Sequence, residues 1–423
     1  MTNPGPVSVL VVLILALGAC AAPQPVEHRP LAPIETVRVG PNRELLVNGE
    51  PFLPIMSWLQ APENFDMLRE LGFNTFMGNQ SGVSPLQQAQ AARSAGGYAV
   101  AQYSELEQIE PAIGHPHLLA WHQHDEPDLP RAREDGEGFE PRTPVAAVAD
   151  YYRNLRDAGA VRPVFVTFTS HFMHEFRNRL TAEQQAEHYP AYARYAEVLG
   201  YDHYPIYGWG TPAWLNRVAS GVEQLVELGE QRKPVYAWIE TSKGSRWMPY
   251  EQQPDVLPEH TRFQVWGAII GGATAIGYFT HAWQPEFAEF AATAEMRREL
   301  ARLNGQLTRL APAILATPSE REIRIELRDI TFNTLPTHHK ATEHAGHLYL
   351  FAQNIDLDPN VQDLGQYDTI APRGGEAIIH VQGLEAGTTV EILDADRTIT
   401  AGDGSFRDSF GPLQERLYRI PLD

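Results

Sequence analysis

A regular alternation of two kinds of segment is the feature of this sequence that most restricts its fold. Between residues 52 and 310, short apolar runs typical of buried strands alternate with longer runs that have an amphipathic, helical period. Such an alternation predicts a parallel sheet, because each helix returns the chain to the same end of the sheet by a right-handed crossover. An all-helical bundle or an all-β sandwich would not generate this pattern.

The number of repeats predicts a closed barrel rather than an open sheet. The expected strands lie at residues 52–58, 74–77, 98–103, 118–124, 162–168, 200–204, 234–239 and 275–279. Helices are expected at residues 62–71, 85–95, 144–158, 182–199, 212–228, 258–271 and 287–310. Eight parallel strands with helices between them close into a (β/α)8 barrel. The predicted fold class is therefore α/β, with the barrel domain at residues 35–314.

The segments that flank the barrel follow different patterns. Residues 37–52 contain two short strands and the hairpin signal Asn48-Gly49, so we expect a β-hairpin across the bottom of the barrel. Residues 318–423 are expected to form a small antiparallel β-sandwich, in which the His- and Thr-rich stretch 331–346 is an insertion between strands. Its strands are expected at 322–327, 347–354, 376–381, 388–393 and 417–420.

The N-terminus has the pattern of a targeting segment. An apolar run at residues 7–17 is too short to span a bilayer, and the sequence L-G-A-C at 17–20 resembles a bacterial lipobox. Because Cys20 is the only cysteine, we expect residues 1–19 to be a lipoprotein signal peptide and Cys20 to carry a lipid. Residues 20–34 form a Pro-rich tether, which predicts an extracytoplasmic, membrane-anchored protein. An ordinary cleaved signal peptide is the alternative, since residues 1–6 contain no Lys or Arg.

The charge balance restricts the possible partners. The chain of 423 residues has 33 Lys and Arg against 53 Asp and Glu, a formal net charge of −20. Nucleic acid is therefore excluded as a partner, because its phosphates require a basic surface. An acidic polymer bound by broad electrostatic attraction is disfavoured for the same reason.

Two of the expected strands end abruptly in carboxylates. The strand at 118–124 is followed by D-E-P at 125–127, and the strand at 234–239 is followed by Glu240. In a parallel barrel the carboxyl ends of the strands face the active-site mouth. Glycoside hydrolysis needs two such carboxyl groups, one to protonate the leaving oxygen and one to attack or stabilise the anomeric carbon. We therefore predict Glu126 and Glu240 as a catalytic pair.

Several motifs together resemble the retaining (β/α)8-barrel glycoside hydrolases. They are N-G-E-P-F-L-P-I at 48–55, L-R-E-L-G-F-N-T at 68–75, D-E-P at 125–127, W-I-E-T at 238–241 and G-Y-F-T-H-A-W at 277–283. This resemblance covers residues 37–314 and implies that Glu126 is the acid/base, Glu240 the nucleophile and Trp283 a sugar platform. It implies no cofactor and no metal. One departure is Asp125, where these enzymes usually have Asn; a carboxylate accepts a hydrogen bond from a sugar but does not donate one.

Other candidate residues lie at strand ends or in the loops that follow. Trp209 and Trp247 lie in loops and are candidate sugar platforms, whereas Trp121 and Trp238 lie inside strands and are expected to pack in the core. The remaining candidates for contact with the substrate are His124, Asp125, His203, Tyr204 and, for sugar hydroxyls, Asn79, Gln80, Gln102 and Tyr103.

Two alternatives stay open from the sequence. His122 and His124 lie on one face of a strand, so a metal-dependent barrel hydrolase is possible, completed by Asp202, His203 and Glu240. A non-catalytic, glycan-binding surface lipoprotein is the other. The favoured function is hydrolysis of β-linked glycans or oligosaccharides; the sugar, the linkage, endo or exo action and the oligomeric state are left undetermined by the sequence.

Overall fold

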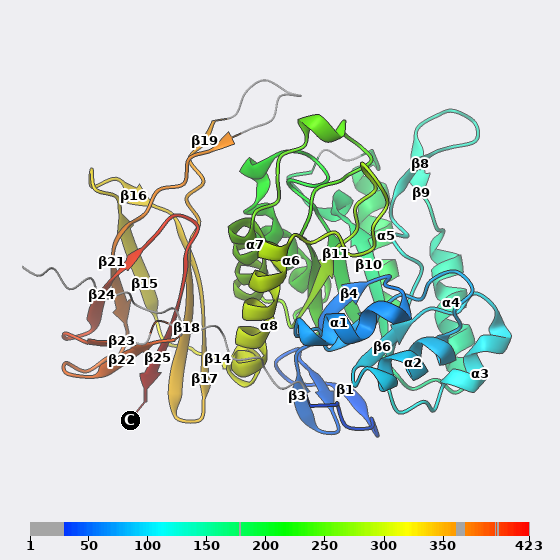
Figure 1. Ribbon diagram of the computed structural model, residues 1–423, viewed down its shortest axis with the longest axis horizontal. Helices are drawn as coiled ribbons and strands as arrows, with labels where there is room; N and C mark the ends of the chain where they lie inside the picture. Colours follow the sequence, from blue (N-terminus) through cyan, green and yellow to red (C-terminus); the bar gives the residue numbers. More distant parts are fainter. Residues whose placement is uncertain (1–28, 177–178, 361–368, 394, 396, 423) are drawn as a thin grey trace, which may run out of the picture.

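The structure is a computed structural model that describes residues 29–423 except 177–178, 361–368, 394, 396 and 423. The predicted signal peptide, Cys20 and most of the tether lie outside these residues. The described chain forms a helix-covered barrel and a separate pair of β-sheets beside it (Figure 1). None of its described helices is both long enough and apolar enough to cross a lipid bilayer.

The predicted (β/α)8 barrel is confirmed. Eight strands form a closed sheet in chain order, and β13 pairs with β4 in parallel to complete the ring. Side chains within the strands are almost all buried, as expected for a parallel sheet covered on both faces. The barrel strands are β4 (Ile55–Trp58), β5 (Thr75–Met77), β6 (Tyr98–Ala101), β7 (Leu118–His122), β10 (Val164–Thr169), β11 (Val198–Asp202), β12 (Val235–Glu240) and β13 (Ala275–Phe279).

The seven helices expected around the barrel are present with shifted ends, and a short helix, α3, follows β6, where none was expected. They are α1 (Phe65–Glu70), α2 (Pro85–Ser94), α3 (Ile109–Ala112), α4 (Val145–Asp157), α5 (Ala182–Arg194), α6 (Arg217–Leu228), α7 (Pro258–Gly271) and α8 (Ala294–Ile314). The expected start of the last helix at residue 287 was wrong, because the Thr293 side chain accepts a hydrogen bond from the Met296 N–H and caps α8. The expected end of α5 at residue 199 was also wrong, since the apolar residues Val198 and Leu199 belong to β11.

Glycines make room for large rings inside the barrel. A Cβ atom at Gly277 would lie 2.3 Å from the ring of Trp238, and one at Gly200 would lie 2.0 Å from the ring of Tyr236. The two rings pack edge-to-face with centroids 5.8 Å apart, and Trp58 contacts Trp238 at 5.4 Å. The floor beneath the barrel mouth is therefore built from interlocking aromatic side chains.

The N-terminal segment forms three strands rather than the expected two-stranded hairpin. The strands are β1 (Val37–Val39), β2 (Leu45–Val47) and β3 (Glu50–Phe52), in that order. Asn48 and Gly49 have φ of 55° and 89° and form the tight turn between β2 and β3, while β1 pairs with the free edge of β2. This sheet lies at the lower end of the barrel in Figure 1, opposite the hairpin of β8 (Pro130–Ala132) and β9 (Phe139–Pro141).

The C-terminal region forms two antiparallel sheets, as predicted. One has the order β14-β17-β18-β25-β22-β23 and the other β16-β15-β21-β24. Their bounds are β14 (Thr317–Pro318), β15 (Ile323–Arg328), β16 (Thr334–Leu335), β17 (Thr337–His344), β18 (His347–Asn354), β21 (Gly375–Val381), β22 (Thr389–Ile392), β23 (Arg397–Thr400), β24 (Ser405–Phe410) and β25 (Glu415–Pro421).

The stretch 331–346 is not the insertion expected from its composition. Most of it forms β17, which pairs with β18 along its whole length. Its polar residues face the barrel: Thr342 Oγ1 donates to the Ala313 carbonyl at 2.7 Å, and Lys340 Nζ donates to the Ile314 carbonyl at 3.0 Å. Because these polar side chains are satisfied by the end of α8, the strand lacks the apolar alternation on which the prediction relied.

The sandwich packs against helices α7 and α8 of the barrel. Gln353 Nε2 donates to the Phe263 carbonyl at 2.9 Å, and the rings of Trp266 and Phe351 stack with centroids 5.8 Å apart. Arg262 lies 3.4 Å from Glu415 across the same contact. The sandwich therefore fixes the position of α7, a helix that also contacts the barrel mouth.

The packing of Trp238 on Gly277 gives a prediction about stability. The substitution Gly277→Ala should lower the free energy of unfolding by about 1–3 kcal/mol, because the new methyl group must displace a fully enclosed ring. Urea unfolding measures the change. Gly114→Ala is the matched control, since a Cβ there meets no atom within 4 Å, and its change should stay within about 0.5 kcal/mol. Equal effects of the two substitutions would contradict this packing.

Candidate active site

The turn after β7 carries the first carboxylate of the barrel mouth. Glu126 has a φ of 45°, a left-handed conformation that is costly for a residue with a side chain. Its N–H donates to the carbonyl of Thr167 on β10 at 3.0 Å, which holds the turn against the neighbouring strand. The side chain is 23% exposed. Backbone strain of this kind is concentrated at functional sites, and here it directs a carboxyl group into the mouth.

A second carboxylate meets Glu126 from β11. A side-chain hydrogen bond joins the carboxyl groups of Glu126 and Asp202, and Arg142 lies 3.6 Å from Glu126 on the other side. Asp202 is the last residue of β11 and is partly exposed. Two carboxyl groups in direct contact cannot both be ionised without strong repulsion, so the pair holds a shared proton.

The pKa values of Asp202 and of two neighbouring acidic groups, Asp125 and Asp128, are raised. Burial raises the pKa of Asp202 well above its usual range, and the charge of Glu126 raises it further. Burial also raises the pKa of Asp125 to about 7, with Glu126 adding to the effect and Arg142 opposing it. Burial raises the pKa of Asp128 to about 7, although Thr169 donates two hydrogen bonds to its carboxylate.

Tyr204 follows β11 and interacts with the carboxyl pair, while its contact with the substrate stays a prediction. Burial raises the pKa of its hydroxyl well above 10, and the charges of Asp202 and Glu126 raise it further. The hydroxyl therefore stays protonated and is a hydrogen-bond donor at the mouth. Its ring packs on Phe279 of β13 with centroids 4.8 Å apart, which fixes its direction.

Glu240 has a different environment from the one that its expected role requires. Its side chain is 0% exposed, and its carboxylate accepts hydrogen bonds from the N–H groups of Ile206 (3.1 Å) and Tyr207 (2.6 Å) and from Nε2 of Gln264 (2.9 Å). Burial raises its pKa to about 7, while these three donors lower it. The structure thus encloses the carboxylate of Glu240 between the β11–α6 loop and α7, at the carboxyl end of β12. Its role as nucleophile stays a prediction.

The two histidines of the metal alternative have separate environments. His122 is fully buried and its Nε2 lies 3.2 Å from Oγ1 of Thr167, whereas the ring of His124 faces Tyr151 at 5.2 Å. Burial lowers the pKa of His122 to about 3 and also lowers that of His124. Within the described part of the chain, no three His, Cys, Asp or Glu side chains are grouped as metal ligands.

His203 and Trp209 belong to the segment between β11 and α6. The His203 ring is buried and stacks on Trp214 with centroids 6.1 Å apart, so its expected contact with substrate is not available in this conformation. Burial lowers its pKa to about 3. Trp209 is 47% exposed and packs its other side on Phe176 at 5.2 Å.

Two other tryptophans form an exposed aromatic surface, here called the aromatic rim. Trp247 follows β12 and is 57% exposed, and Trp283 follows β13 and is 39% exposed. The guanidinium of Arg246 lies 5.6 Å from the ring of Trp247 and 5.0 Å from that of Trp283, and Phe287 contacts Trp283 at 5.1 Å. Exposed rings held in this way can stack on the apolar face of a sugar. Trp121 and Trp238 are buried, which confirms the core positions expected for them.

Sequence reasoning missed the roles of Asp202 and Arg142 at the mouth. The sequence predicts Asp202 only as a possible metal ligand, although it is a carboxylate at a strand end, the same signal that indicates Glu126 and Glu240. Arg142 lies in the long loop after β7, and its N–H groups also reach the carbonyl of Asp125. Its sequence context contains no comparable signal.

Comparison with known proteins finds the fold and little sequence similarity. No family model matches the chain, and no curated protein matches it. A solved structure titled "Glycoside hydrolase" matches with a TM-score of 0.54 and 10% identity, over 92% of this chain and 97% of the other. The α-amylase of Geobacillus thermoleovorans, solved with acarbose, matches with a TM-score of 0.51 and 8% identity, over 88% and 98%. At these identities the similarity establishes a shared fold.

The enclosure of Glu240 predicts a pH-dependent stability. Because its pKa is raised from 4.5 to about 7 in the folded state, Glu240 makes folding less favourable as the pH rises through this window, by about 1.4 kcal/mol per pH unit. Glutamine does not titrate. The free energy of unfolding of wild type, relative to that of Glu240→Gln, should therefore fall by about 3 kcal/mol between pH 4.5 and 7. Urea unfolding across this range measures it, and a constant difference would contradict the described burial.

Proposed function

We propose that the protein is a glycoside hydrolase that cleaves β-linked glycans with retention of configuration. The observation that carries the proposal is the contact of two carboxyl groups at the mouth of a (β/α)8 barrel, Glu126 after β7 and Asp202 at the end of β11. One of them is partly exposed on a strained turn, and a protonated tyrosine lies beside them. Such a pair supplies the acid and the carboxylate that hydrolysis of a glycosidic bond requires.

Position assigns the two roles, because Glu126 lies on the exposed turn and Asp202 at the end of a strand. Burial and the charge of Glu126 hold the proton on Asp202 before the reaction, so their hydrogen bond must first pass it to Glu126. Glu126 transfers it to the glycosidic oxygen as the bond from this oxygen to the anomeric carbon breaks. Asp202, ionised by the first transfer, attacks the anomeric carbon. Glu126, now ionised, then takes a proton from water, which displaces Asp202 and releases the sugar.

The spacing of the pair favours retention over inversion. Inverting enzymes hold their carboxyl groups about 6.5–9.5 Å apart to admit a water molecule, whereas retaining pairs lie about 5–5.5 Å apart. Carboxyl groups joined by a hydrogen bond are closer to the shorter of these two distances than to the longer one. Tyr204 would donate a hydrogen bond to the bound sugar, and Arg142 would stabilise Glu126 once it has lost its proton.

A second assignment keeps Glu240 as the nucleophile. Its position at the carboxyl end of the seventh barrel strand favours it, in line with the resemblance of W-I-E-T at 238–241 to retaining barrels. This role requires the β11–α6 loop to move, because the N–H groups of Ile206 and Tyr207 now occupy the carboxylate. The aromatic rim would equally suit a protein that binds glycans without cleaving them.

We also propose that the enzyme acts outside the cytoplasm and is held on the membrane by a lipid on Cys20. The L-G-A-C sequence and the Pro-rich tether after it support this location. A hydrolase of external glycans would work on the side of the membrane where such a tether extends.

Replacement of the three carboxylates separates these assignments. Sugar release from a panel of aryl glycosides and oligosaccharides should fall at least about 1,000-fold in Glu126→Gln and in Asp202→Asn, because each removes one partner of the chemical step. Glu240→Gln should keep activity within about tenfold of wild type at a temperature where it is folded. Asp403→Asn, at an exposed position in the sandwich, is the control and should match wild type.

Two results would contradict the proposal. Full activity in Asp202→Asn with a large loss in folded Glu240→Gln would transfer the nucleophile role to Glu240. Binding of oligosaccharides by wild type without any cleavage, tested without added metal and again with it, would favour the non-catalytic alternative.

A further inference from the structure

We infer that a polar pocket beside Glu126 binds the continuation of an uncharged glycan chain, so that the enzyme cleaves within chains rather than at their ends. The inference rests on the proposed hydrolase function for its catalytic part, but binding at the pocket is testable without it. The pocket has a volume of about 730 Å³, within the range of about 300–1,000 Å³ typical of ligand sites.

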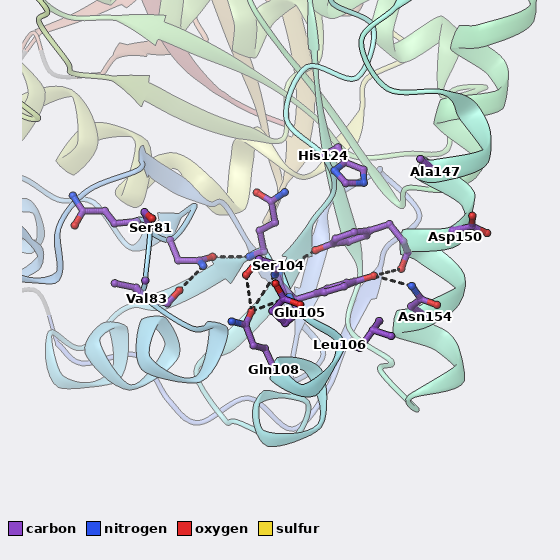
Figure 2. A pocket seen from close by; sticks show the side chains of 16 residues that line it. Ser81, Val83, Ser104, Glu105, Leu106, Gln108, His124, Ala147, Asp150 and Asn154 are labelled. Atoms are coloured by element: carbon purple, nitrogen blue, oxygen red, sulfur yellow. Dashed lines mark hydrogen bonds between the residues drawn. The ribbon is translucent and has the colours of Figure 1, made fainter.

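The pocket opens on the same face of the barrel as the carboxyl pair. Its walls come from the residues that follow β5, β6 and β7 and from one side of α4 (Figure 2). His124 is part of the wall and lies two residues before Glu126 on the same turn. A sugar in the pocket therefore lies near Glu126 and can belong to the same glycan chain as a sugar bound at Glu126.

Side-chain amides line the wall, and two of them have one polar atom held by a hydrogen bond to a neighbouring residue. Gln108 accepts from the N–H of Ser104 at 3.0 Å through Oε1, and Asn154 donates to the Tyr103 hydroxyl at 3.3 Å through Nδ2 (Figure 2). For Nε2 of Gln108, Oδ1 of Asn154 and the side-chain amide of Gln102, no hydrogen bond is found with another described residue. Prepositioned amides with one free donor or acceptor suit sugar hydroxyls, which both donate and accept.

Charge in the pocket excludes acidic sugars. No Lys or Arg is found among the described residues that line it, whereas Glu105 and Asp150 are both exposed there. Asp150 is paired with Arg153 on the outer surface of α4, so Glu105 leaves the lining with a negative charge. His124 does not offset this charge, because burial lowers its pKa. A uronate or sulfate group would meet the carboxylate of Glu105, and Arg142, whose charge reaches His124, is already paired with Glu126.

The pocket and the aromatic rim lie on opposite sides of the barrel mouth. In the closed ring, β5, β6 and β7 are the second to fourth strands, and β12 and β13, which lead to Trp247 and Trp283, are the seventh and eighth. The rings of Tyr103 and Tyr151 stack on each other at 4.1 Å and are buried, so the pocket binds through hydrogen bonds and the rim through ring faces. The carboxyl pair, at the ends of the fourth and sixth strands, lies on one arc of the ring between the pocket and the rim, so a glycan bound along this arc crosses the pair and is cleaved within its chain.

The experiment fills the pocket without touching the carboxyl pair. Ala147 of α4 lines the pocket, and its neighbour Ala146 is exposed and does not, so Ala147→Trp and Ala146→Trp form a matched pair. Binding of cellohexaose, mannohexaose and xylohexaose is measured by calorimetry, in wild type and in a Glu126→Gln background that prevents turnover. An anionic β-1,4-mannuronate hexamer is the charge control.

The expected result is that at least one neutral hexasaccharide binds and that Ala147→Trp weakens it at least tenfold, whereas Ala146→Trp does not. The anionic hexamer should bind at least tenfold more weakly than the neutral one. Ala147→Trp should also lower kcat/KM for the hexasaccharide while leaving that for a small aryl glycoside within about twofold.

Unchanged hexasaccharide affinity in Ala147→Trp, binding of none of the neutral hexasaccharides, or equal affinity for the anionic hexamer would each overturn the inference. Release of single sugars from the chain end alone would overturn the cleavage mode. Neutral binding that depends on Ala147, without cleavage of any glycoside, would sustain the pocket and reject the hydrolase function. Cleavage of glycosides at a rate that Ala147→Trp does not change would sustain the hydrolase function and reject the pocket.

Discussion

The pairing of β13 with β4 is the constraint on which the mouth of this protein depends. A parallel sheet that closes on itself must bring the carboxyl ends of all its strands into one ring. Glu126 follows β7 and Asp202 ends β11, two strands that are separated by β10, and the curvature of the closed barrel directs their side chains toward each other. The contact of these two carboxyl groups is thus a consequence of closure, and their shared proton is a consequence of the contact.

A second set of contacts links the sandwich to the same mouth. The sandwich packs on α7 through Gln353 and Phe351, and α7 carries Gln264, which binds the carboxylate of Glu240. Glu240 in turn holds the N–H groups of Ile206 and Tyr207. A buried carboxylate is expensive unless donors surround it, and here the donors belong to the loop that follows Asp202 and Tyr204. Through these hydrogen bonds Glu240 fixes the position of the loop that follows Asp202 and Tyr204.

The sequence predicted the repeating strands and helices, but not the contacts that depend on the direction in which a side chain points. Buried strands are apolar on both faces, so their runs were visible, and the barrel and most helix positions followed from them. Strand β17 was missed because its polar side chains are satisfied by α8, which no local pattern reveals. Glu126 was found at a strand end. The same signal is present at Asp202 and Glu240, and a sequence does not tell which of them faces the mouth and which is enclosed by a loop.

Covalent trapping is the most direct test of the carboxyl pair. The 2,4-dinitrophenyl 2-deoxy-2-fluoro derivative of whichever sugar the enzyme releases should inactivate it by forming a stable glycosyl ester, because the fluorine slows the second step. Mass spectrometry of the digested protein locates the ester. We expect it on the peptide that contains Asp202. An ester on the peptide that contains Glu240 would show that the β11–α6 loop opens and that the enclosed glutamate is the nucleophile.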